Sequence, residues 1–551
     1  MPTQHPTAAP ASIAWPEPYE SAYQAQQRRH GPTVPGARRP DITRPLRLLI
    51  ASIVDLADER PHGMITWLAE VLATSRETIY TVGETWSQPP GADKPTATEA
   101  QPVDRKQLAR AALTLLVEGA VQLRPAQRCL KALIGQRRSL GWLCQLIDDA
   151  GERAGAVLAA ADWSGATRLI VSRDELFMSD LAWLLTVDTR SHAIVSGHVE
   201  TQVDAETWAV SLALDADKTG GRIEGLAEDA AKWYPLSVSL AQALLGTPFN
   251  PDVQKDNWHL LRQARQTVRD AERIALRHLA TAERKASRVR PGFMIIRDFD
   301  GWEAAHERAA RAIATADAIC TGVDLLHEAL ELVDRRSGRI IDRATAEWYL
   351  DEIIAHLRRT ESDLAEALAG TIERQADQLL CFHNRLATAL DIWRSAALAH
   401  FEAAEVVAVF EQAIARAWRL ERAVTNGRRQ AKAPAQRAAA YAQALCQGDG
   451  EARHLADCLH AVLDGTVRTS SASENFNSIL RAYLWGRRYL RGRRTAQNWL
   501  NLLVLWYNLH VFERGKRAGK SPFQWAGVRV HGPDGQPTDD WLVALGYAAA
   551  A

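Results

Sequence analysis

The sequence predicts an α+β protein in which helices predominate and a mixed sheet is interrupted by a long helical segment. Short apolar runs separated by turn residues occupy positions 167–256, a pattern typical of strands. From about Leu260 to His460 the apolar residues instead recur with the 3.6-residue period of helices. Because 551 residues are too many for one core, we expect several domains.

A helix-turn-helix domain is predicted at 41–86, after a proline-rich segment, 1–40, that we expect to be a disordered arm. One apolar helix ends near Ala73, and Thr74-x-x-Glu77 is expected to cap the next. The second helix of such a motif contacts DNA, although an ordinary helical hairpin has the same pattern. The candidate DNA contacts lie in its first turns and are Ser75, Arg76, Thr78 and Tyr80.

A second helical domain is predicted at 104–160, after a linker at 87–103 that is rich in proline, glycine and threonine. Its last helix follows the basic residues Arg137 and Arg138, so the pattern indicates a second helix-turn-helix-like unit. Two such units in tandem would suit a long, asymmetric DNA site.

The strand region, 161–259, is the first part of a sheet domain. Its expected order is three strands, a helix, a strand, a second helix and a last short strand. Asp174 ends the first strand, and Asp229 ends the strand after the first helix. The remaining predicted parts are an all-helical domain, the second part of the sheet domain and a tail without assigned function: 260–460, 461–520 and 521–551.

The second part of the sheet domain combines a carboxylate with strong positive charge. Glu474 opens a predicted helix, and Ser471-x-x-Glu474 also fits a capping box. From Arg481 to Lys520 ten basic residues accompany one acidic residue, Glu513, whereas the chain as a whole has no net charge. Such a surface can neutralise a nucleic-acid backbone. The candidate DNA contacts here are Asn477, Arg481, Arg487, Arg488, Arg491, Arg493 and Arg494.

Three acids, Asp174, Asp229 and Glu474, stand at strand ends or a helix start, where a sheet can gather them at one edge. Carboxylate oxygens are the ligands that Mg²⁺ and Mn²⁺ prefer, and two such ions can hold both the attacking and the leaving oxygen of a phosphoryl transfer. Asp and Glu at these positions also serve as turn or cap residues. Asp256 is a rival for the second ligand, and Asp188 is a weaker rival for the first.

Other features narrow the class of protein. The six cysteines never form a CxxC pair, so we expect neither a zinc site nor disulfides. No apolar run approaches the roughly 18–20 residues of a membrane span. The N-terminus has no signal-peptide pattern, and we therefore expect a cytoplasmic protein.

Four blocks of the sequence carry a resemblance to a known family. They are Asp174-Glu175-Leu-Phe177, Gly225-Leu-Ala-Glu-Asp229, Gln254-Lys-Asp256-Asn-Trp258-His259, and Ser473-Glu474-Asn475-Phe476-Asn477-Ser478-Ile-Leu-Arg481 with the following Arg487-Arg488. These blocks are similar to those of bacterial insertion-sequence transposases of the DDE class. The resemblance implies an RNase H-like fold with an all-helical insertion before the last catalytic helix, as in hAT-type transposases. It also implies that Asp174, Asp229 and Glu474 are the catalytic triad and hold two Mg²⁺ or Mn²⁺ ions.

The activity that this resemblance implies is DNA transposition. A water activated by metal would cut a strand at the end of a mobile element, and the freed 3′-hydroxyl would then attack target DNA. The implied partners are double-stranded DNA and further copies of the chain, in the cytoplasm at the nucleoid. Two alternatives stay open, namely a domesticated, catalytically inactive DNA-binding regulator and an RNase H-type nuclease without strand transfer.

Overall fold

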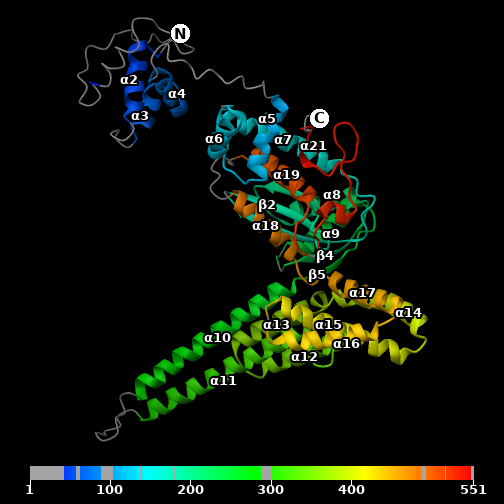
Figure 1. Ribbon diagram of the computed structural model, residues 1–551. Coiled ribbons are helices and arrows are strands. Elements are labelled where there is room, and N and C mark those ends of the chain that lie inside the picture. The colour runs from blue at the N-terminus through cyan, green and yellow to red at the C-terminus, as the bar shows by residue number, and fades with distance from the viewer. Residues whose placement is uncertain are drawn as a thin grey trace. The chain divides into compact units, whose positions relative to one another are not determined.

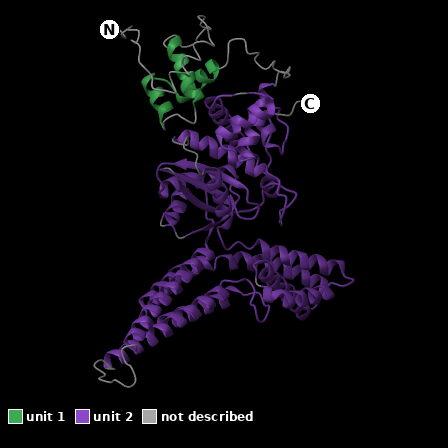
Figure 2. Cartoon of the chain, turned by 60° about the vertical axis from the view of Figure 1, so that its left-hand side comes forward, with its two compact units in different colours: residues 1–103 green, residues 104–551 purple. Residues whose placement is uncertain are grey.

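The computed structural model describes Ser21 and residues 42–56, 63–87, 104–136, 138–178, 180–229, 231, 233–286, 299–427, 429–484, 492–515 and 517–547. Nearly all of the predicted arm, 1–40, and linker, 87–103, lie outside these residues, as do the candidate contacts Arg137, Arg487, Arg488 and Arg491. Residues 1–103 and 104–551 form two compact units (Figure 2). The predicted class is confirmed, because helices predominate and the strands form one small mixed sheet.

In its described residues, the first unit contains three packed helices: α2 (Arg44–Asp55), α3 (Met64–Val71) and α4 (Arg76–Ser87). They enclose an apolar core of their own. Gly83 on α4 allows a close approach to α2, because a Cβ at this position would lie 2.5 Å from a methyl carbon of Val54. This unit therefore has the helical content that the sequence predicts for 41–86.

The cap of α4 differs from the prediction. The hydroxyl of Ser75 accepts a hydrogen bond from the backbone N–H of Thr78 at 3.1 Å. Thr74, the predicted cap, instead belongs to the preceding turn, in which its N–H donates to the Ala69 carbonyl at 2.8 Å. The prediction was wrong by one residue, because either hydroxyl satisfies the local sequence pattern.

The second unit is built around a five-stranded sheet with the spatial order β3–β2–β1–β4–β5 (Figure 1). β1, β2 and β3 are antiparallel, whereas β4 and β5 add in parallel beside β1. Two helices connect the parallel strands, so the element order agrees with the predicted one. The bounds are β1 Leu169–Met178, β2 Leu181–Asp188, β3 Ile194–Glu200, α8 Ala205–Lys218, β4 Ile223–Glu228, α9 Tyr234–Leu245 and β5 Asp252–Lys255.

The first strand is longer than predicted. We expected it to end at Asp174, but β1 continues to Met178 in antiparallel pairing with β2. Its parallel pairing with β4 does end early, at Ser172 opposite Ala227. Asp174 therefore follows the point where the two parallel strands separate, although it is not the last residue of its strand.

A buried group of charges joins the three parallel strands. Glu228 on β4 is completely buried and forms ion pairs with Arg173 on β1 and with Lys255 on β5, the latter at 3.3 Å. The Arg173 guanidinium also lies over the rings of Trp208 and Tyr234, at 5.5 and 4.5 Å from their centroids. One carboxylate thus compensates two buried cations and fixes the alignment of β1, β4 and β5.

The helical segment after β5 forms its own apolar core. Its first two helices are the longest and run side by side as a hairpin (Figure 1). No helix in the described parts of the chain is both long and apolar enough to cross a membrane. The helices are α10 Asn257–Ala286, α11 Phe299–Ala329, α12 Arg343–Arg358, α13 Asp363–Leu379, α14 Phe382–Phe401, α15 Ala404–Thr425, η1 Arg429–Ala431, α16 Lys432–Leu445 and α17 Gly450–Gly465.

The chain enters and leaves this helical segment at one point. The backbone N–H of Asn257, at its start, donates to the carbonyl of Arg468, just after its end, at 3.0 Å. The carboxylate of Asp256 accepts from the backbone N–H of Ser470 at 2.9 Å. The segment that follows the helical region, at Arg468 and Ser470, is therefore hydrogen-bonded to the residues that precede it, Asp256 and Asn257.

The helices of 104–160 and the tail pack against the sheet domain. α7 (Leu140–Ala159) lies on α19 (Arg493–Leu509), and Gly151 allows this contact because a Cβ there would lie 2.3 Å from the Asn498 carbonyl oxygen. Arg110 on α5 (Arg105–Val117) pairs with Asp540 of the tail at 3.2 Å. α6 is Leu123–Ile134, and the tail contains α20 Pro522–Ala526 and α21 Trp541–Ala544.

We predict that Glu228→Gln strongly destabilises the second unit, by about 3–5 kcal/mol, because it leaves two buried cations without a counter-charge. Glu224→Gln is the matched control, since Glu224 lies on the same strand and pairs with Arg168 at the surface, where the loss should be below about 1 kcal/mol. The midpoints of urea denaturation, followed by tryptophan fluorescence, measure both effects. Equal midpoints for the two variants would contradict the assigned role of Glu228.

Candidate active site

Asp174 on β1 and Asp229, the residue directly after β4, lie beyond the end of the pairing between these two parallel strands. Ser172 lies opposite Ala227 in the register of β1 and β4, and each acid follows two residues later. The buried Arg173 and Glu228 immediately precede them. Because successive side chains of a strand alternate between its faces, Asp174 belongs to the face of β1 opposite to that of the buried Arg173.

Glu474 comes from α18 (Ser471–Leu484), which packs against β1 and β2. One turn later on the same helix, Asn477 donates through Nδ2 to Asp174 Oδ2 at 2.6 Å. The hydrogen bonds among the described residues include none between Ser471 and Glu474, because the helix already begins at Ser471. The predicted capping box is therefore not formed, and Glu474 is not occupied in capping its own helix.

The rival ligand Asp256 has a different environment. It precedes α10, and its Oδ1 accepts from the backbone N–H of Trp258 at 2.7 Å. Its Oδ2 accepts from Ser470 and lies 2.9 Å from Nδ1 of His259. The other ring nitrogen of His259, Nε2, is 3.6 Å from Glu474 Oε1. Asp256 thus orients His259 toward Glu474, while both of its own carboxylate oxygens already accept hydrogen bonds.

The acids influence one another electrostatically. Burial, with a smaller contribution from the charges of Asp229 and Glu474, raises the pKa of Asp174 to about 6, although hydrogen bonds from Asn477 and the Glu175 backbone lower it. The hydrogen bond with Asp256 raises the pKa of His259, and the charges of Glu474 and Asp229 add to this effect. The three predicted acids therefore share one electrostatic environment.

A fourth acid, Glu175, interacts electrostatically with Asp174 and Asp229, although it belongs to the other face of β1, and it was missing from the predicted site. Burial raises its pKa to about 7, and the charges of Asp229 and Asp174 contribute, although the Tyr234 hydroxyl donates to it at 2.8 Å. The neighbouring position in the Asp174 block was the only signal for it in the sequence. Asp188, the weaker rival for the first ligand, is buried and accepts from Ser191 at the far end of β2.

The donor chemistry of this site suits a hard cation, because its three acids offer carboxylate oxygens. Asn477 adds a buried Oδ1 without a hydrogen-bond partner. The described residues nevertheless contain no group of three His, Cys, Asp or Glu side chains placed to hold one metal ion. Both oxygens of Asp174 accept hydrogen bonds, from Asn477 and from the Glu175 backbone. Metal binding would thus require these side chains to rearrange.

The candidate DNA contacts fall into two groups. Ser75, Arg76 and Tyr80 are exposed at the start of α4, and Arg481 is exposed on α18. Three arginines instead make contacts within the second unit. Arg493 pairs with Glu200 of β3 at 2.6 Å, Arg494 pairs with Glu152 of α7, and Arg138 is half-buried over the ring of Trp142. Arg493 and Arg494 therefore also anchor the start of α19.

No family model matches the chain, and no curated protein matches it.

We predict that Asp174→Asn stabilises the protein above about pH 6 in the presence of a chelator. The folded-state pKa of about 6 lies above the ordinary value of 3.8, so the folded chain binds this proton more tightly than the unfolded chain. Ionised Asp174 lowers the free energy of unfolding fully above about pH 6 and not at all below about pH 4. Replacing it by Asn should therefore raise the free energy of unfolding by up to about 3 kcal/mol above about pH 6.

Urea-denaturation midpoints at pH 4 and pH 8 measure this difference. The matched control is Asp217→Asn, which removes an exposed carboxylate of α8. A gain of the same size at both pH values, or none at pH 8, would contradict the buried charge at Asp174.

Proposed function

We propose that this protein is a DNA transposase of the DDE class, which cuts and joins DNA strands by in-line phosphoryl transfer. One observation carries the proposal. The parallel register of β1 and β4 aligns Asp174 with Asp229, and α18 adds Glu474 and Asn477 from a segment more than two hundred residues later. Acids recruited from such distant positions to one sheet edge indicate a site selected for chemistry.

The arrangement of the whole second unit supports an RNase H-like core with a helical insertion. Three antiparallel strands are followed by two parallel strands in one mixed sheet. The helices α10 to α17 separate β5 from α18. This order of elements agrees with the architecture implied by the sequence resemblance to DDE transposases, which supports a common site for the three acids.

The proposed reaction has two displacements at phosphorus. In the first, water attacks and the bond to the 3′-oxygen of the element's end breaks, which leaves a 3′-hydroxyl and a 5′-phosphate. In the second, that 3′-oxygen attacks a target phosphodiester, and a 3′-hydroxyl of the target leaves. Two bound Mg²⁺ or Mn²⁺ ions would stabilise the attacking and leaving oxygens.

The residues around the three acids have supporting roles in this proposal. Asn477 orients Asp174 through its hydrogen bond, and Asp256 holds His259 beside Glu474. Arg481 and the basic residues after it would bind the DNA backbone, while α4 would read the element's ends. Further copies of the chain would assemble on double-stranded DNA at the nucleoid.

One observation favours the alternative of a catalytically inactive regulator. The described residues hold no ready-made group of three metal ligands. A domesticated transposase that binds DNA without cutting it would have no need of such a group. The two proposals differ in cleavage but agree in DNA binding.

We predict that the wild-type protein nicks duplex DNA carrying the sequences that flank its gene, in Mg²⁺ or Mn²⁺, and joins the ends to a target. Asp174→Asn and Glu474→Gln should abolish both products while leaving DNA affinity intact, because they remove metal ligands. Asn477→Ala should slow cleavage by about 10–100-fold, since it removes the group that orients Asp174. Denaturing gels with end-labelled strands measure the products, and Asp217→Asn is the control.

The outcome also separates the alternatives. Cut strands without joined products would support a nuclease. Binding without cleavage in either metal, over several end sequences, would support the inactive regulator.

We predict that Arg76→Ala weakens binding to the element's ends by about 5–150-fold, the effect of losing one contact to a base edge. Its exposed position in the first turn of α4 suits such a contact. Fluorescence anisotropy with end and random duplexes measures the difference. Thr85→Ala, two to three turns further along α4, is the control, and equal losses for both duplexes would contradict a sequence-reading role.

A further inference from the structure

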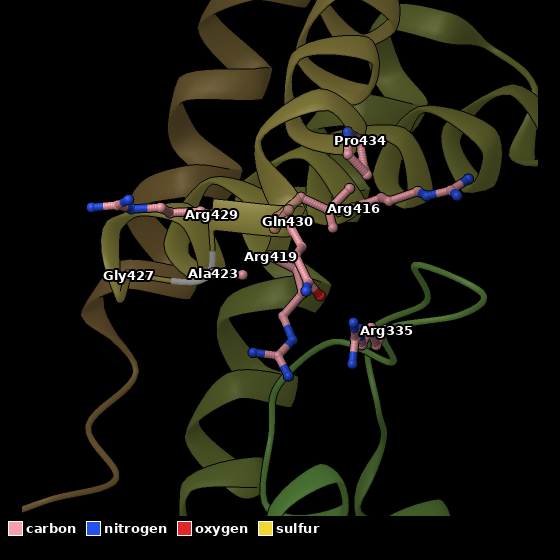
Figure 3. A pocket seen from close by; sticks show the side chains of 10 residues that line it. Arg335, Arg416, Arg419, Ala423, Gly427, Arg429, Gln430 and Pro434 are labelled. Carbon is pink, nitrogen blue, oxygen red and sulfur yellow. The ribbon is translucent and has the colours of Figure 1, made fainter.

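A hollow lined by arginines lies on the helical segment, in a part of the chain without an assigned role. It has a volume of about 610 Å³ and lies between α15, the turn after α11 and η1 (Figure 3). A second hollow of about 410 Å³ shares the lining residues Arg416, Leu420 and Pro434 with it. We call the combined surface the arginine groove, after its residues Arg335, Arg416, Arg419, Arg429 and Arg437.

Most of the charge in the arginine groove is not neutralised. Arg419 is buried and pairs with Glu331 at 2.9 Å and with Glu328 at 3.5 Å. The other four arginines are exposed, and the ion pairs among the described residues include none of them. Neither hollow has an acidic residue in its lining. Like charges gathered in this way repel one another, so the groove favours an anionic ligand.

The wall that carries Arg335 is held in place. Asp334 accepts from the backbone N–H of Ser337 at 2.6 Å, which closes the turn after α11. Gln412 on α15 donates to the Ser337 carbonyl, also at 2.6 Å. Gly338 has a φ of +77° and lies so close to Arg416 that a Cβ would be 2.8 Å from the Arg416 Cβ. The turn is therefore fixed against α15 before any ligand binds.

The arginines are spread out instead of converging on one point. In Figure 3 the guanidinium groups of Arg416 and Arg429 extend in opposite directions, with Arg335 and Arg419 below them. A single phosphate would be contacted by side chains that converge on it. An extended chain of phosphates can meet the guanidinium groups one after another, and each planar fork can bind a phosphate through two N–H groups.

We propose that the arginine groove binds the backbone of double-stranded DNA without reading its sequence. This inference rests on the proposed function, which supplies DNA as the partner. The groove is built from elements other than those of the acidic site and of the basic region after Arg481. It gives the helical segment a function of its own, which is to hold a length of duplex beyond the DNA at the acids.

The test compares two triple variants of the full-length protein. Arg335→Gln/Arg416→Gln/Arg429→Gln removes three exposed charges from the groove and leaves the buried Arg419 in place. Arg265→Gln/Arg308→Gln/Arg311→Gln removes three exposed charges from α10 and α11, so both variants have the same net charge. Affinity for a random duplex is measured by fluorescence anisotropy between 50 and 200 mM salt, with thermal melts as a check of folding.

The groove variant should lose up to about 2.7 from the slope of log affinity against log salt, about 0.9 for each lost phosphate contact. Between 50 and 200 mM salt, the factor by which its affinity for DNA decreases would then be about 40 times smaller than for the wild type. The α10–α11 control should keep the wild-type slope. Nicking of short end duplexes should persist in the groove variant.

Four results would overturn the proposal, one of them from a parallel anisotropy titration with polyglutamate as an acidic-peptide probe. An unchanged slope in the groove variant, or equal losses in both variants, would show that the groove makes no specific contribution, and the proposed transposase activity would still stand. If polyglutamate binding is lost while the DNA slope is unchanged, the groove accepts an acidic protein segment instead. Failure of the wild type to bind any duplex would remove the proposed function together with the groove.

Discussion

The buried carboxylate of Glu228 is the constraint on which the acidic site depends. It compensates Arg173 on one neighbouring strand and Lys255 on the other, and each of the three residues directly precedes an acid. The following residues are Asp174, Asp229 and Asp256. The ion pairs fix the ends of β4 and β5 beside β1, so that Asp229 and Asp256, which directly follow these two strands, start from fixed points. A single set of ion pairs thus fixes the backbone that precedes all three acids.

The same arrangement has a free-energy cost, because it brings ionised carboxylates close together in a partly buried place. Asp174 and Glu175 are both partly buried, and the charge of Asp229 raises the pKa of each. Carboxylates that merely stabilise a fold are usually paired with cations or exposed to water. Here a hydrogen bond from Asn477 and one from Tyr234 only partly offset the cost. A loss of stability from partly buried carboxylates is expected where evolution has retained residues for a reaction and not for stability.

Much of the fold could be predicted from local patterns, because strand and helix periods are visible in the sequence. The element order depends on those periods alone, whereas the choice of Asp174 and Asp229 among many acids also depended on the resemblance to a known family. Contacts between distant segments could not be predicted in this way. Glu175 becomes part of the site only through Tyr234 and Asp229, and the tail, to which we assigned no function, packs through Asp540 on Arg110.

Errors of detail have the same physical origin. Thr74 and Ser75 are equally good caps by composition, and only the path of the turn decides between them. Arg493 and Arg494 stay candidate DNA contacts, but local composition did not reveal that acids of β3 and α7 also pair with them. The arginine groove escaped notice because its residues come from a turn and from helices that are each ordinary in charge.

The hydrogen-bonded junction between Asn257 and Arg468 has an evolutionary consequence. A segment whose two ends meet can be lengthened, shortened or exchanged without moving the framework from which it projects. The helices from α10 to α17 therefore behave as a cassette, and their surface can diversify independently of the carboxylates. The residues at the junction, among them the histidine beside Glu474, and the contacts of α13 and α14 with Gln254 and Asp252 of β5 tie the history of the cassette to that of the sheet.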